Sequence, residues 1–139
     1  IWSQAAGKVD AIVVGVGTGG TLTGIARCLR EKNPGLRVVA VEPRASAVLS
    51  GGKPGLHGIQ GLGAGFVPTT LERNLIDDVI AVSDLDAERM TTRLAREEGL
   101  LVGPSSGANV HAALKVAREM KSTHRVVTIL CDTGERYQS

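Results

Sequence analysis

A glycine-rich loop between a buried strand and an amphipathic helix limits the folds open to this chain. The loop, Gly-Val-Gly-Thr-Gly-Gly-Thr at 15–21, follows a largely β-branched run at 11–14, which is typical of a strand buried on both faces. Apolar residues then recur at helical spacing, at Leu22, Ile25, Ala26 and Leu29. Asn-Pro-Gly at 33–35 indicates a helix end, and an apolar run at 38–41 indicates a second strand. Residues 11–42 therefore predict a strand, helix and strand unit, and with it a parallel sheet.

The rest of the chain predicts more of the same architecture. A third strand is expected at 79–82, followed by a helix with Ser83 as its N-cap. Another helix is predicted at 107–121 and a fourth strand at 126–130. Because the composition is even and no repeat is present, we predict a single α/β domain over residues 1–139, with an open, mainly parallel sheet flanked by helices. The chain opens without methionine, so we expect it to be a fragment of a longer protein.

Charge and composition exclude several classes of partner. Sixteen basic and fourteen acidic residues leave a net charge of +2, without the excess that binding to a nucleic acid backbone requires. The three aromatic residues offer no row of rings on which bases could stack. The apolar runs are far shorter than the roughly 18 residues of a membrane span. Cys28 and Cys131 form neither a metal motif nor a disulfide framework. We therefore expect a cytoplasmic chain that binds no nucleic acid, membrane or metal.

The loop at 15–21 is a candidate anion site. Glycines let backbone N–H groups approach a phosphate, and a helix N-terminus adds roughly half a positive charge. Thr18 and Thr21 can each add a hydroxyl donor. We therefore predict that the loop binds a phosphate group.

The same glycines allow a second interpretation. Gly15, Gly17 and Gly20 satisfy G-x-G-x-x-G, and Glu42 ends the second strand, where an acid that binds a ribose would lie. The alternative from another class of function is therefore a nucleotide-binding regulatory module.

Three later segments are also informative. Residues 57–68 intersperse glycine with small or apolar residues, a pattern that lets backbone line a small pocket. His57 within it is expected to be a solvated or hydrogen-bonded side chain rather than a catalytic base. At 103–108, Ser105 or Ser106 is expected to be an N-cap, and no pattern marks either as a nucleophile. Residues 132–137 predict a capped turn with a structural role.

Taken together, these segments resemble the pyridoxal-phosphate enzymes of the cysteine synthase family, also called O-acetylserine sulfhydrylases. The resemblance spans nearly the whole chain and roughly the C-terminal half of the family. Its motifs are Gly17-Thr18-Gly19-Gly20-Thr21, Val41-Glu42-Pro43, Ser50-Gly51-Gly52-Lys53-Pro54-Gly55, Gly58-Ile59-Gln60-Gly61 running into Gly63-Ala64-Gly65-Phe66-Val67-Pro68, Arg96-Glu97-Glu98-Gly99, Ser105-Ser106-Gly107 and Asp132-Thr133-Gly134-Glu135-Arg136-Tyr137.

This resemblance implies that the chain is the large-domain portion of a fold-type II pyridoxal-phosphate enzyme. By it, the cofactor phosphate is held by Gly17, Thr18, Gly19, Gly20 and Thr21. Ser105 would face the pyridine nitrogen as a neutral donor, and such a donor suits β-elimination and replacement. Gly61, Ala64 and Gly65 would border the amino-acid pocket.

The resemblance also implies substrates and partners. The family replaces the acetate of O-acetylserine with sulfide to give L-cysteine. Its members are usually homodimers, and a C-terminal peptide of serine acetyltransferase can enter their active site. A cystathionine β-synthase-like enzyme or one that uses O-phosphoserine is the alternative within the same fold.

One part of the family pattern has no counterpart here. The lysine that forms the Schiff base and the loop that binds the substrate carboxylate belong to the other half of the family, and none of the five lysines matches. We therefore assign no catalytic residue and expect this chain alone to be inactive. Two smaller departures are Pro104, where the family usually has an aliphatic residue, and Cys131, where many members have proline.

Overall fold

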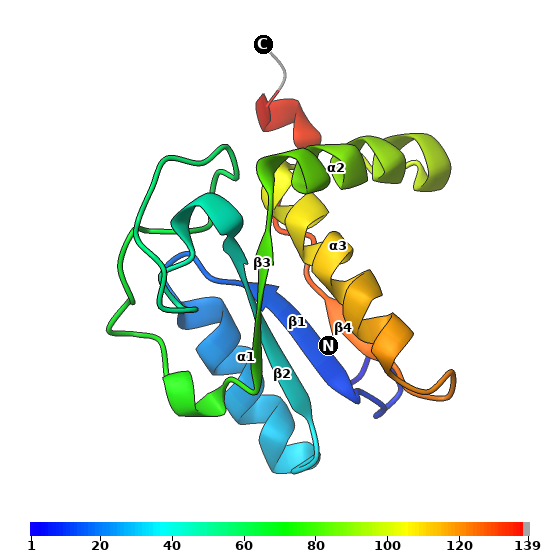
Figure 1. The fold of residues 1–139 in the computed structure, drawn as a ribbon. Coiled ribbons are helices and arrows are strands. Elements are labelled where there is room, and N and C mark those ends of the chain that lie inside the picture. Colours follow the sequence, from blue (N-terminus) through cyan, green and yellow to red (C-terminus); the bar gives the residue numbers. More distant parts are fainter. Residues whose placement is uncertain (138–139) are drawn as a thin grey trace.

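The strands form one parallel sheet with the order β3-β2-β1-β4 (Figure 1). The computed structural model describes residues 1–137. Its strands and α-helices are β1 (Ala11–Gly15), α1 (Gly20–Lys32), β2 (Arg37–Pro43), β3 (Asp78–Val82), α2 (Asp84–Glu98), α3 (Pro104–Glu119) and β4 (Val126–Thr128). Short 3-10 helices are η1 (Arg44–Ser46), η2 (Arg73–Leu75) and η3 (Gly134–Tyr137). The open parallel sheet with its helices confirms the predicted α/β class.

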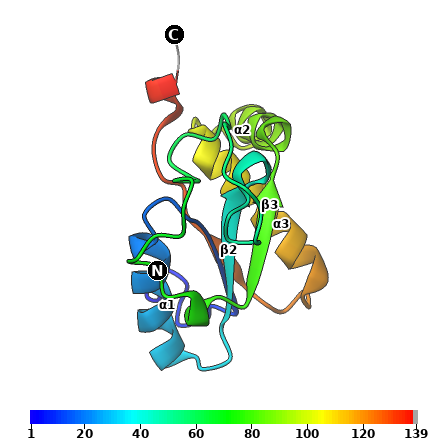
Figure 2. The ribbon, with the colours of Figure 1, turned by 60° about the vertical axis from the view of Figure 1, so that its left-hand side comes forward.

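Helices cover both faces of the sheet, which Figure 2 shows with α1 on one side and α3 on the other. Successive side chains of a strand point to opposite faces, so each strand contributes to two apolar layers. One layer joins the sheet to α1 and contains Ile12, Val14, Val38, Ala40, Leu22, Ala26 and Leu29. The other joins it to α3 and contains Val13, Val39, Val41, Ala108, Ala112 and Val116. Burial of both faces explains why β1 and β2 read as continuous apolar runs.

Helix α2 packs on α3 beside the sheet. A Cβ atom on Gly107 would overlap the Ala87 carbonyl oxygen and the Thr91 hydroxyl, so glycine is needed where the two helices meet. Ser83 caps α2 as predicted, because its Oγ accepts a hydrogen bond of 3.1 Å from the backbone N–H of Asp86. At the other end of α2, Gly99 adopts a left-handed conformation with φ 68°.

Two predicted boundaries differ in the structure. Helix α3 begins at Pro104, with Gly103 as its N-cap, so the prediction that Ser105 or Ser106 is the N-cap is wrong. Proline suits the first helical position because its φ is already helical and the missing N–H has no partner there. Strand β4 ends at Thr128 rather than at residue 130.

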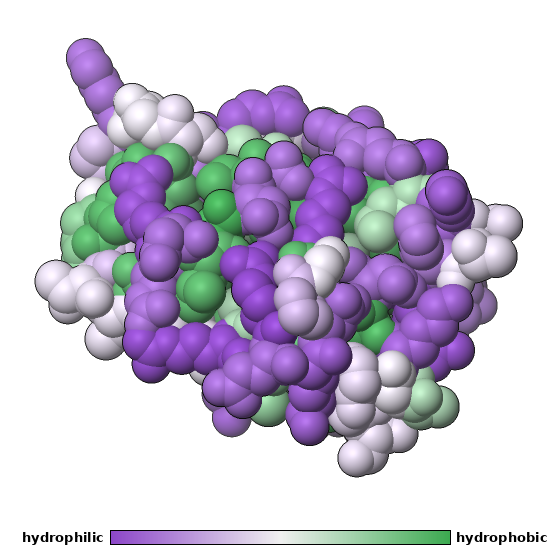
Figure 3. Space-filling model, turned by 90° about the horizontal axis from the view of Figure 1, so that it is seen from below, coloured by the Kyte–Doolittle hydropathy of each residue, from purple (hydrophilic) through white to green (hydrophobic). Residues whose placement is uncertain are grey.

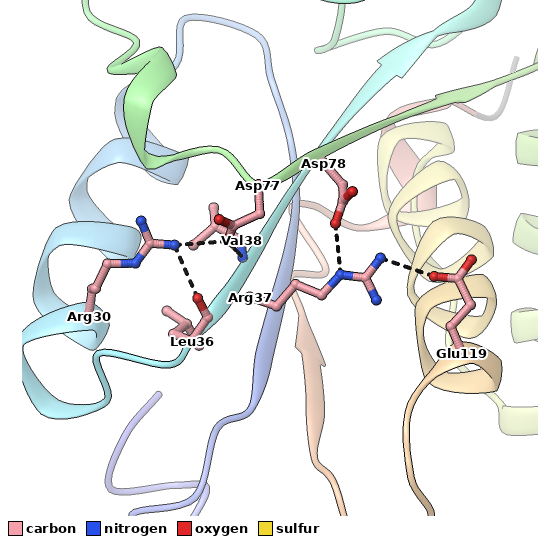
Figure 4. Close-up of polar contacts among 7 residues, drawn as sticks. All are labelled: Arg30, Leu36, Arg37, Val38, Asp77, Asp78 and Glu119. Carbon is pink, nitrogen blue, oxygen red and sulfur yellow. Dashed lines mark hydrogen bonds and ion pairs between the residues drawn. The ribbon is translucent and has the colours of Figure 1, made fainter.

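Charged side chains connect the elements at the amino ends of the strands (Figure 4). The Arg37 guanidinium donates from Nε to Asp78 Oδ2 at 2.8 Å and from Nη2 to Glu119 Oε2 at 3.0 Å. These two carboxylates, Asp78 first, raise the pKa of Arg37 above its usual value. Arg30 of α1 pairs with Asp77 at 2.9 Å. Figure 3 views this end from below and shows hydrophilic side chains across it, with hydrophobic ones visible between them.

Among residues 1–137, no helix combines the length and apolar character needed to cross a bilayer.

Candidate functional site

A pocket of about 260 Å³ lies at the carboxyl ends of β1 and β4. The chain leaves β1 toward α1 and β2, whereas β4 lies on the other side of β1. Open α/β sheets bind ligands where the strand order changes direction in this way. The pocket is lined by Val14, Gly15, Gly17, Thr18, Gly19, Thr21, Gln60, Gly61, Leu62, Ser105, Ile129, Cys131, Asp132 and Tyr137. Its volume is close to the roughly 300 Å³ at which small-molecule sites begin.

The two helices that start at this pocket, α1 and α3, leave their N-termini available to a ligand. Within the described chain, neither has a side-chain cap, and neither has an acidic residue in its first turn. Helix α2 differs, because Ser83 caps it and Asp84 and Asp86 occupy its first turn. Backbone N–H groups and the helix dipole at the start of α1 and α3 therefore favour an anion in the pocket.

Close backbone contacts fix the shape of the loop before α1. A Cβ on Gly17 would overlap the Gly61 carbonyl oxygen, and one on Gly19 would lie 2.7 Å from Leu71 Cβ. Gly19 also has φ 86°, in the left-handed region that favours glycine. On the outer side of the loop, the Thr70 hydroxyl donates to the Thr18 carbonyl. Residues 70–71 and Gly61 thus hold the loop from two sides.

The side chains of Ser105 and Ser106 have different roles. Ser105 is 3% exposed and lines the pocket in the first turn of α3. Ser106 Oγ lies elsewhere and accepts a hydrogen bond of 2.9 Å from the backbone N–H of Cys131. Of the two serines, only Ser105 is placed to act on a ligand.

Residues 129–137 supply a wall of the pocket. The sequence predicts only a structural turn for 132–137. The Tyr137 hydroxyl donates to Asp132 Oδ2 at 2.5 Å, and this hydrogen bond raises the pKa of Tyr137. Asp132 Oδ1 is buried with no hydrogen-bond partner among residues 1–137. The thiol of Cys131 also lines the pocket. The family motif at 132–137 is the sequence signal for this wall, but the pocket itself forms only when the chain after β4 folds against α3.

The segment at 57–68 places its predicted residues in different surroundings. Gly61 lines the pocket, and its Cβ position lies 3.9 Å from Ser105 Oγ. Ala64 lines a separate small cavity together with Val16 and Glu42. Gly65 lies beside Pro54. The structure therefore brings Gly61 together with Ser105 and the loop before α1 in one pocket, whereas Ala64 shares its separate cavity with Gly17, and Gly65 lines neither.

Glu42 is not directed toward the pocket. Its side chain is 1% exposed. Its carboxylate accepts hydrogen bonds from Leu49 N at 2.8 Å and from Ser50 N and Oγ at 3.0 and 2.9 Å. Glu42 is buried, both of its oxygens are bonded to residues 49–50, and it does not line the pocket, so the nucleotide-binding alternative loses its acidic residue.

Other features of the described residues lack this chemistry. A wider, open groove of about 890 Å³ follows the outer edge of β4, lined by residues such as Ile1, Val127 and Leu130, and no helix begins there. No group of three or more potential metal ligands is found among residues 1–137. No lysine is among the described residues that line the pocket.

Comparison with known proteins agrees with this geometry. The profile of the family "Pyridoxal-phosphate dependent enzyme" matches residues 1–132, so the chain belongs to that family. A cysteine synthase of Staphylococcus aureus is 50% identical over 137 residues, which cover 98% of this chain and 44% of the relative. The predicted resemblance to cysteine synthases is confirmed.

Solved structures give the same result. An O-acetylserine sulfhydrylase from Entamoeba histolytica superposes with a TM-score of 0.93 at 41% identity, over 98% of this chain and 40% of that one. An O-acetylserine-dependent cystathionine β-synthase from Helicobacter pylori superposes with a TM-score of 0.92 at 42% identity, over 98% and 44%. The chain thus spans less than half the length of these relatives.

Proposed function

We propose that this chain is the part of a cysteine synthase that holds the pyridoxal 5'-phosphate cofactor. The observation that carries the proposal is the pocket where the uncapped N-termini of α1 and α3 meet, without acidic residues in either first turn. The reaction proposed for the full-length enzyme is replacement of the acetate of O-acetylserine by sulfide to give L-cysteine. The full-length homodimer and its contact with a serine acetyltransferase peptide are part of the same proposal.

The residues of the pocket fit the cofactor. The backbone N–H groups of Gly17, Gly19 and Gly20 and the hydroxyls of Thr18 and Thr21 would hold its phosphate. Ser105 would donate to, or accept from, the pyridine nitrogen as a neutral partner. When bound, the cofactor supplies an electron sink for negative charge at the substrate α-carbon, which no side chain provides.

Gly61 is the residue of its segment that we assign to the amino-acid side of the pocket, because it faces Ser105. In the proposal, Ala64 and Gly65 border the same space in the full-length enzyme. The identity of the second substrate is supported by the cysteine synthase relative, whereas the Helicobacter pylori enzyme is named for cystathionine synthesis. The alternative, a cystathionine β-synthase-like reaction, would use the same cofactor site with a thiol in place of sulfide.

We propose further that the chain alone is inactive. Lys8 and Lys32 illustrate the reason: Lys8 Nζ donates to the Thr123 carbonyl, and Lys32 Nζ lies 5.8 Å from the centroid of the Trp2 ring. None of the five lysines is among the described lining residues of the pocket. The described lining of the pocket therefore supplies no lysine amine for a covalent bond to the cofactor.

The experiment is titration of purified chain with pyridoxal phosphate, followed by absorbance and by intact mass after borohydride reduction. We expect binding that inorganic phosphate displaces, weakened in Thr18→Ala and Thr21→Ala but unchanged in the control Thr92→Ala, on the exposed face of α2. We expect no adduct at a single lysine. Absence of phosphate-competed binding would overturn the proposed site, and turnover of O-acetylserine with sulfide at enzyme-like rates would overturn the proposed inactivity.

A further inference from the structure

We propose that His57 is a positioning residue, whose imidazole holds residues 57–63 in the turn that carries Gly61 to the pocket. This inference rests on the proposed function. His57 Nδ1 accepts a hydrogen bond of 3.1 Å from the backbone N–H of Ile59, so the ring proton lies on Nε2. Nε2 then donates to the Gly63 carbonyl at 3.0 Å. The ring therefore bridges the turn, with one nitrogen at each end of it.

The turn held by His57 is joined directly to the phosphate loop. The backbone N–H of Gly63 donates to the Val16 carbonyl at 3.1 Å. Gly61, with φ 92°, places its carbonyl oxygen where a Cβ on Gly17 would be. Movement of the turn therefore changes both the wall formed by Gly61 and the space beside Gly17.

The imidazole is the side chain whose hydrogen bonds join the two ends of this turn, whereas Asp84 bonds to Gly58 alone within it. Leu62 N donates to the Ile59 carbonyl at 3.3 Å, which is a long hydrogen bond. A Cβ on Gly63 would lie 2.8 Å from His57 Nε2, so ring and backbone are in close contact. The two ring hydrogen bonds thus fix the path of the backbone between His57 and Gly63.

The two carboxylates near the turn bond to backbone groups and not to the ring. Asp84, in the first turn of α2, accepts from the backbone N–H of Gly58 at 2.8 Å. Glu42 lines the small cavity beyond Gly63, and its carboxylate is already bonded to residues 49–50. Pro43 of β2 contributes an uncharged ring beside Gly63.

Three variants test this role. His57→Phe keeps a ring and removes both hydrogen bonds, whereas His57→Asn keeps an acceptor for the N–H of Ile59 and loses the bond to Gly63. The control is His111→Asn on α3, whose ring lies 3.9 Å from Asp86 and does not line the pocket. We expect pyridoxal phosphate affinity to fall by about five- to tenfold in His57→Phe, because each hydrogen bond contributes about two- to tenfold. We expect partial rescue in His57→Asn and no change in the control.

Nuclear magnetic resonance of the chain without ligand supplies an independent readout. The amide signals of Ile59, Gly61 and Gly17 should shift in His57→Phe, because the turn loses the two hydrogen bonds that hold it. The same signals should keep their wild-type positions in His111→Asn. Unshifted Gly61 and Gly17 signals in His57→Phe, or wild-type affinity in that variant, would overturn the role of His57. If the wild-type chain binds no pyridoxal phosphate, the proposed function fails, and the amide signals still decide for or against His57.

Discussion

Gly17 and Gly24 lie seven residues apart, yet the structure requires glycine at only one of them. A Cβ on Gly17 would overlap the Gly61 carbonyl oxygen, which is backbone and cannot rotate away. Nothing lies within 4 Å of a Cβ placed on Gly24, which is exposed in the middle of α1. Close approach between two loops, and not flexibility, is therefore what Gly17 provides.

For Gly17→Ala we expect pyridoxal phosphate binding to weaken by about tenfold or more, equivalent to about 1.4 kcal/mol. The loops that carry Gly17 and Gly61 must separate, and the crowding should lower the free energy of unfolding by about 1–3 kcal/mol. The control Gly24→Ala should bind as the wild type does. Its free energy of unfolding should rise by about 0.5–1 kcal/mol, because alanine is the better helix former. Ligand titration and urea unfolding measure both effects, and equal binding by the two variants would refute the steric argument.

Tyr137 is the single tyrosine of the chain, so its ionisation can be followed by phenolate absorbance. The pKa of Tyr137 is raised above its usual value, and the hydrogen bond to Asp132 is the main cause. A raised folded-state pKa means that the bond stabilises the fold fully below the ordinary pKa. That contribution is lost as the pH rises through the folded-state pKa. Asp132→Ala should therefore lower the titration midpoint; an unchanged midpoint would show that the hydrogen bond to Asp132 does not raise the pKa of Tyr137.

At the scale of elements, the helix N-termini are of two kinds: one is capped by its own chain, and two are open to the pocket. The N-terminus of α2 is satisfied by its own chain, through Ser83, Asp84 and Asp86. The N-termini of α1 and α3 have no such side chains among the described residues, and both meet the pocket. Removing a cap from α2 should therefore affect stability alone, whereas changes at the start of α1 or α3 should affect binding.

We expect Ser83→Ala to lower the free energy of unfolding by about 1 kcal/mol, because the N–H of Asp86 loses its acceptor. Pyridoxal phosphate affinity should not change, since Ser83 does not line the pocket. Ser122→Ala, at an exposed turn, is the matched control and should stay within about 0.5 kcal/mol of the wild type. Chemical unfolding with parallel ligand titration separates the two effects, and an affinity loss in Ser83→Ala would contradict the division.

At the scale of the whole molecule, β4 forms an open edge of the sheet. It pairs only with β1 among the described strands. Its outer edge adjoins the groove that includes Ile1 and Leu130, which are 37% and 42% exposed. Unpaired edges beside apolar side chains favour association between chains.

The isolated chain should therefore self-associate as its concentration rises, with a second copy along β4. Leu130→Lys should shift the equilibrium toward monomer, because it places a charge beside that edge. Leu56→Lys adds the same charge at a side chain that is 98% exposed and outside the groove, and should behave as the wild type. Sedimentation velocity over a concentration series distinguishes the two variants. A wild-type chain that stays monomeric at every concentration, or equal effects of the two variants, would contradict association along β4.

The class of the fold and the position of the glycine-rich loop at 15–21 could be predicted from the sequence. Both are local patterns: buried strands, helical apolar spacing and glycines between them are visible within a few residues of each other. The loop at 15–21 and Ser105 were identified in this way or through the family resemblance, and the structure places them in one pocket with Gly61.

Only the tertiary structure decided which distant residues meet. It turned Glu42 inward to residues 49–50, joined Asp132 to Tyr137 at the pocket, and placed Ala64 in a separate cavity. It also gave each ring nitrogen of His57 its hydrogen-bond partner. Backbone conformation follows largely from neighbouring residues, whereas the partner of a polar side chain depends on segments brought together by packing. Sequence patterns do not record those contacts.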